Sequence, residues 1–97
     1  MKQETISILF FILKNRTLKN GEAPILLRVT IDGAYEEIRI QRSVAVNQWN
    51  QKLGMCKAKH REAKELNEYI RALHTKLNEL HKTMLFEGAL ITPDILL

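Results

Sequence analysis

Residues 21–41, GEAPILLRVTIDGAYEEIRIQ, decide the fold of this chain. Asp32 and Gly33 lie between two apolar-rich runs. An Asp-Gly pair suits a type I′ turn, because both central residues of that turn have positive φ angles. The stretch therefore predicts a β-hairpin with strands at about residues 23–31 and 34–42. Pro24 has no backbone N–H to donate, which places it at the start of the first of these strands.

The two faces of the predicted hairpin differ in chemistry, because successive side chains alternate across a strand. If Asp32 and Gly33 form the turn, one face is mostly apolar and pairs Ile31 with Ala34, Val29 with Glu36, Leu27 with Ile38, and Ile25 with Ile40. The other face is polar and pairs Thr30 with Tyr35, Arg28 with Glu37, Leu26 with Arg39, and Pro24 with Gln41. We expect the apolar face to pack on the rest of the domain and the polar face to stay open for function.

Two further elements complete the expected fold. Residues 5–14 predict a first strand that is apolar on both faces, so its register is left open. Residues 61–87 predict one long helix, ended by Gly88. Its apolar stripe follows helical spacing and consists of Leu66, Ile70, Leu73, Leu77, Leu80 and Met84. The expected class is α+β, a three-stranded antiparallel sheet packed against a long C-terminal α-helix.

Three features of the second half have two interpretations each. The helical stripe is expected to pack on the sheet, but its spacing also fits the a and d positions of a dimeric coiled coil. Trp49 is expected to anchor the loop in the core; the rival is an exposed platform on which bases stack. The basic run that follows either lies along a phosphate backbone or is a solvated loop, and includes Lys52, Lys57, Lys59, His60 and Arg61.

Length and charge indicate one small domain with an anionic partner. The chain has 97 residues and a formal net charge of +4. Residues 1–60 hold ten Lys and Arg against five Asp and Glu, whereas residues 61–97 hold five against six. The basic excess on the strand-rich half favours nucleic acid over a membrane. The single cysteine, Cys56, fits a reducing cytoplasm, and the apolar run at residues 6–13 is too short to span a bilayer as a helix.

The sequence offers no complete catalytic or metal site. His74 and His81 are two helical turns apart, too far to bind one metal ion, and are expected to pack beside the stripe. No nucleophile motif, phosphate-binding loop or paired cysteines are present. We therefore expect no cofactor, no metal and no small-molecule substrate.

The polar face of the hairpin is the best candidate site. Short β-strands can enter the major groove of DNA and contact base edges. Arg28 and Arg39 are expected to bind guanine, Gln41 to bind adenine, and Thr30 and Tyr35 to reach phosphate or a thymine methyl group. Basic residues of the first loop are expected to hold the DNA backbone, namely Lys14, Arg16 and Lys19. The competing interpretation is that Arg28 pairs with Glu37 across the strands.

The order of these elements resembles the N-terminal arm-type DNA-binding domain of tyrosine recombinases, the integrases of conjugative transposons and related mobile elements. The specific parts are the pattern Gly-x-x-Pro-Ile-x-x-Arg at residues 21–28 and the pair Trp49-Asn50. The resemblance covers about residues 5–92. It implies a sheet that enters the major groove at arm sites, with double-stranded DNA and other parts of the integrase as partners, and a catalytic domain elsewhere.

The expected domain organisation follows from the same resemblance. Residues 1–91 form the arm-type domain, and residues 92–97 begin a core-binding domain, because Thr92-Pro93-Asp94 has the pattern of a helix start. The chain itself is then not an enzyme, although its parent protein is. The alternative function is a protein-interaction module that uses the helical stripe for dimerisation.

Overall fold

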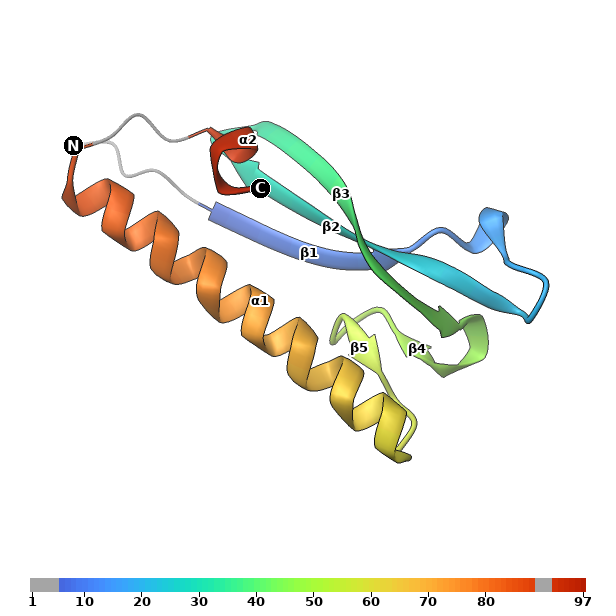
Figure 1. The fold of residues 1–97 in the computed structure, drawn as a ribbon. Coiled ribbons are helices and arrows are strands. Elements are labelled where there is room, and N and C mark those ends of the chain that lie inside the picture. Colours follow the sequence, from blue (N-terminus) through green and yellow to red (C-terminus); the bar gives the residue numbers. More distant parts are fainter. Residues whose placement is uncertain (1–5, 89–91) are drawn as a thin grey trace.

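The computed structural model describes residues 6–88 and 92–97 and confirms the expected α+β fold. Strands β1 (Ile6–Ile12), β2 (Glu22–Ile31) and β3 (Ala34–Ala45) form an antiparallel sheet in the order β1-β2-β3. The long helix α1 (Arg61–Phe86) runs beside this sheet (Figure 1). Thr5, expected in the first strand, lies outside the described residues. No helix of the described residues is long and apolar enough to cross a membrane.

Smaller elements connect these parts. Short 3-10 turns lie at η1 (Lys14–Arg16) and η2 (Val46–Gln48). Strands β4 (Trp49–Asn50) and β5 (Met55–Cys56) form a two-stranded hairpin, which leads into α1. The last element is the short helix α2 (Pro93–Leu96), which contacts β2, β3 and α1.

The pairing of β1 with β2 settles which face of the first strand is covered. Ile8 pairs with Val29 and Phe10 with Leu27, so the even-numbered side chains of β1 share the covered face of β2. Phe10 is buried, while Leu9 on the opposite face is exposed. The face of the sheet that packs against α1 is called the inner face below, and the opposite one the outer face.

The hairpin register is confirmed near the turn and wrong at its far end. Thr30 pairs with Tyr35, Arg28 with Glu37 and Leu26 with Arg39, as expected. Pro24, however, pairs with Ser43 and not with Gln41.

The cause is a β-bulge in β3. Between the pairs Leu26–Arg39 and Pro24–Ser43, the single residue Ile25 faces three residues of β3, so the expected pair of Ile25 with Ile40 is also wrong. Gln41 has a φ of 64°, in the left-handed region, and this conformation accommodates the extra residues. Strict alternation from the turn cannot foresee such an insertion.

The core lies between the inner face and α1. Ile25, Leu27 and Val29 of β2 are its largest fully buried side chains. Trp49 is 7% exposed, and its indole Nε1 donates to Oε1 of Gln51 at 2.8 Å. Trp49 is therefore a core anchor, as expected, and the rival interpretation as an exposed platform for bases is wrong.

The stripe of α1 packs within the chain. Ile70 and Leu77 are buried, and Leu66, Leu73 and Met84 are partly buried against the same core. The expected stripe differs at one turn, since Leu80 is 39% exposed and His81 is 4% exposed in its place. His81 lies one residue further round the helix, which points it more directly at the core. His74 is exposed.

Candidate nucleic-acid interface

The outer face of the sheet carries side chains from all three strands. Register places Ser7, Leu9 and Phe11 of β1, Leu26, Arg28 and Thr30 of β2, and Tyr35, Glu37 and Arg39 of β3 on it. The helices and the β4–β5 hairpin pack against the inner face, so the side chains of Leu9, Tyr35 and Arg39 are left exposed. The outer face is therefore the candidate for binding.

Arg28 lies at the middle of the outer face in a fixed setting. Its Nε donates to Oε2 of Glu37 at 2.7 Å, and its Nη2 lies 2.5 Å from the same oxygen. The guanidinium carbon is 5.1 Å from the ring centre of Phe11 and 4.9 Å from that of Tyr35, within the range of cation–π attraction. The cross-strand pair of Arg28 with Glu37, which the sequence offered as the alternative to DNA contact, is therefore formed. Even so, 39% of the Arg28 side chain stays exposed.

Thr30 and Tyr35 are cross-strand partners beside Arg28. Tyr35 is 58% exposed and Thr30 is partly buried. Part of the Tyr35 ring supports Arg28, so this residue has a packing role as well as an accessible hydroxyl group.

Arg39 and Gln41 lie nearer the other end of the sheet. Both are exposed, and both line a depression of about 240 Å³ together with Leu18 of the first loop. Gln41 reaches this place from the bulge and not from a regular ladder position. The structure thus brings Arg39 and Gln41 together at one end and leaves Arg28 in the middle.

The first loop carries Lys14, Arg16 and Lys19, all exposed. The loop has internal hydrogen bonds: Thr17 Oγ1 donates to the Lys14 carbonyl at 2.9 Å, and the Leu18 N–H donates to the Glu22 carbonyl at 2.6 Å. It extends beyond the end of α1 (Figure 1). Its three cations are therefore held on a defined turn at the end of the sheet where Arg39 and Gln41 lie.

Charge on this surface is strongly asymmetric. Five cationic side chains belong to the outer face and the first loop, namely Arg28, Arg39, Lys14, Arg16 and Lys19. The exposed carboxylate on the same face is that of Glu37, and it is paired with Arg28. A positive surface of this kind attracts polyanions at long range.

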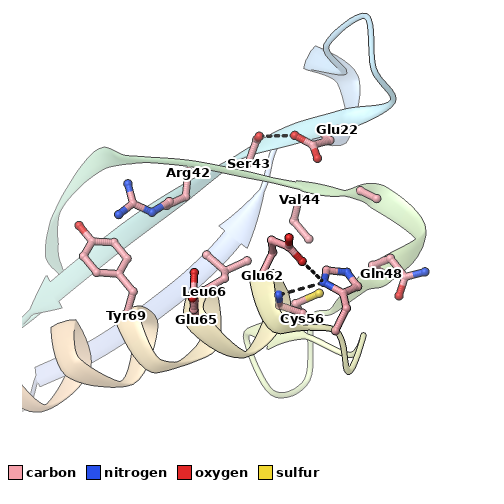
Figure 2. A pocket seen from close by; sticks show the side chains of 13 residues that line it. Glu22, Arg42, Ser43, Val44, Gln48, Cys56, Glu62, Glu65, Leu66 and Tyr69 are labelled. Carbon is pink, nitrogen blue, oxygen red and sulfur yellow. Dashed lines mark hydrogen bonds and ion pairs between the residues drawn. The ribbon is translucent and has the colours of Figure 1, made fainter.

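A second basic residue of β3, Arg42, was not among the expected site residues. Its guanidinium carbon lies 4.4 Å from the ring centre of Tyr69 on α1 (Figure 2). Arg42 is exposed and also lines the depression formed by Leu18, Arg39 and Gln41. Continuing the alternation past Ile40 would have placed it on the inner face. Arg42 and Tyr69 line a cleft of about 350 Å³ between β3 and α1, whose wall also includes the carboxylates of Glu22, Glu62 and Glu65. These acidic groups make the cleft a poor site for phosphate.

Comparison with known proteins assigns a family. The sequence model of the arm DNA-binding domain matches residues 10–97, which is most of the chain. Searches of curated proteins and of solved structures found no significant match. The match agrees with the three-stranded sheet, the long helix and the open basic face, and this chain belongs to the arm DNA-binding domain family, the DNA-binding domain found at the N-terminus of tyrosine recombinases and integrases.

Proposed function

We propose that the outer face of the sheet enters the major groove of double-stranded DNA at the arm sites of a mobile element. The outer strands of a three-stranded sheet are about 10 Å apart, at roughly 4.8 Å per strand spacing. The major groove is about 12 Å wide, so a sheet of this size fits with its side chains pointing at the base edges. The observation that carries the proposal is the open outer face with its cluster of cations.

The proposed roles follow from side-chain chemistry and position. Arg28 and Arg39 bind guanine through two parallel hydrogen bonds, and Gln41 binds adenine in the same way. Thr30 and Tyr35 contact phosphate or the thymine methyl group. The loop cations Lys14, Arg16 and Lys19 neutralise phosphates on the flanking backbone, which sets the position of the sheet without reading sequence.

We also propose the wider setting of this domain. It directs a site-specific tyrosine recombinase, acting in DNA integration in the bacterial cytoplasm, to its sites, and another domain of that protein cuts the DNA. Residues 92–97 would lead toward the core-binding domain. Neither Tyr35 nor Tyr69 acts as a nucleophile in this proposal, because the cutting step belongs to another domain of the recombinase.

A salt titration of duplex binding tests this proposal. The logarithm of Kd should rise linearly with the logarithm of the salt concentration, because DNA binding releases condensed cations. Replacing a phosphate-binding cation, as in Lys14→Ala, should reduce that slope by about 1 and weaken all duplexes alike. Arg39→Ala should cost about 1–3 kcal/mol on the preferred duplex and relax base preference at one position.

The matched control is Lys82→Ala, which removes an exposed cation from α1, away from the outer face. It should leave slope and preference unchanged. The proposal is wrong if Lys82→Ala weakens binding as much as Lys14→Ala, or if Arg39→Ala binds like the parent.

A further inference from the structure

Arg28 differs from the other exposed cations of the outer face because it is already oriented. Two of its nitrogens contact one carboxylate oxygen of Glu37, and two aromatic rings lie within about 5 Å of its guanidinium carbon. Each contact comes from a different neighbour: Phe11 on β1, and Tyr35 and Glu37 on β3. The side chain is thus held across the full width of the sheet.

We propose that Glu37 is a positioning residue for Arg28, and that Arg28 so held determines specificity for one G·C base pair. This inference rests on the proposed entry of the outer face into the major groove. The inference gives Glu37 a role that favours base recognition, although its carboxylate repels the DNA phosphates.

The remaining donors of Arg28 suit this role. A guanidinium has five N–H donors in a planar fork. Glu37 occupies the edge formed by Nε and Nη2. The edge formed by Nη1 and the second Nη2 hydrogen is not used by Glu37. Its two parallel N–H groups match the O6 and N7 acceptors of guanine. The contact with Glu37 therefore selects which edge of Arg28 faces outward.

The aromatic contacts add a second constraint. Rings within about 6 Å of a cation attract it through their electron-rich faces, and they restrict the tilt of the guanidinium plane. An arginine that is ordered before binding loses less rotamer freedom when it forms its two hydrogen bonds. Arg39 provides the contrast, since no ion pair involving it occurs among the described residues.

The test compares Glu37→Gln with Glu36→Gln. Glu36 is the neighbouring residue, is exposed and pairs with Val29 on the inner face, so its replacement removes the same charge without touching Arg28. Each variant is incubated with a library of randomised duplexes, and the bound duplexes are sequenced. Affinity for the unselected library is measured in parallel, and thermal unfolding confirms that each variant is folded.

We expect the parent to enrich one G·C pair that Arg28→Ala fails to enrich. In Glu37→Gln the preference at that pair should fall about tenfold, while affinity for the unselected library stays equal or rises, because a negative charge facing the phosphates is gone. Glu36→Gln should keep the full preference. Glu37→Asp, which keeps the charge on a shorter side chain, should restore part of it.

If Glu37 only stabilised the fold, Glu37→Gln would lower the affinity for the preferred duplexes and the affinity for the unselected library together. The two measurements therefore distinguish a structural role from a positioning role. The inference is overturned if Glu37→Gln and Glu36→Gln give the same base preferences while Arg39→Ala still changes them; in that outcome the proposed function stands. If the parent enriches no sequence at all, groove reading by this face is wrong, and the inference is wrong with it.

Discussion

Leu27 lies at the centre of the middle strand and is 1% exposed. Its truncation leaves a cavity between the sheet and α1 that the surrounding side chains fill only in part. Leu27→Ala should therefore lower the free energy of unfolding by about 2–5 kcal/mol, measured by urea denaturation. Leu53, which is 65% exposed, provides the control, and Leu53→Ala should change stability by less than about 0.5 kcal/mol. Equal effects of the two changes would contradict the assigned core.

Asn67 is a second residue whose contribution can be measured alone. Its Oδ1 accepts from the Cys56 N–H at 2.9 Å, and its Nδ2 donates to the Cys56 carbonyl at 2.8 Å. Both backbone groups of Cys56 are thus satisfied by one side chain, which ties β5 to α1.

Asn67→Ala should cost about 1–3 kcal/mol of unfolding free energy, because it leaves a partly buried donor and acceptor without their partner. Hydrogen exchange should accelerate at the Cys56 amide. Asn67→Asp keeps the acceptor and should protect that amide better than Asn67→Ala does. Unchanged exchange at Cys56 in both variants would show that β5 is held by other contacts.

At the scale of single elements, the bulge in β3 depends on Gln41 in a left-handed conformation with a φ of 64°. A side chain in this region costs roughly 1–2 kcal/mol, and glycine avoids this cost but loses about 0.5–1 kcal/mol through its larger unfolded-state entropy. Gln41→Gly should therefore be neutral or stabilise the domain by up to about 1.5 kcal/mol. Gln41→Val should destabilise it, because a β-branched residue fits this region poorly. The unfolding temperatures of the two variants, compared with that of the parent, test this prediction. A glycine variant less stable than the parent would argue against the bulge.

The elements also show which sequence signals were sufficient. The Asp32-Gly33 turn fixed the register as far as the Leu26–Arg39 pair, because pairing from a two-residue turn has a single solution. Beyond that pair, the bulge in β3 shifts the register. Gln41 at the bulge has a positive φ, and a glutamine in the sequence does not predict that conformation. The first strand had apolar residues on both faces, so only its partner strand could decide that Phe10 is buried and Leu9 exposed.

For the molecule as a whole, the sequence predicted that one face of the sheet packs on the helix and that the other stays open. It did not predict the side-chain contacts on the outer face. The stripe of α1 required a partner surface, and the apolar face of the hairpin supplied it. The sequence placed Arg28 and Arg39 on the same face, but it could not show that Arg28 is engaged by Glu37 and two rings whereas Arg39 is exposed. Side-chain contacts across three strands depend on the twist and register of the whole sheet.

The DNA-binding face can be mapped by recording amide shifts in NMR spectra of the protein while a duplex selected by the chain is added. We predict that the largest changes fall in the first loop and on β2 and β3 around Arg28, Arg39 and Gln41, while the solvent-facing side of α1 around Lys82 stays unchanged. Changes concentrated on α1, with the outer face of the sheet unaffected, would show that DNA does not bind to the sheet.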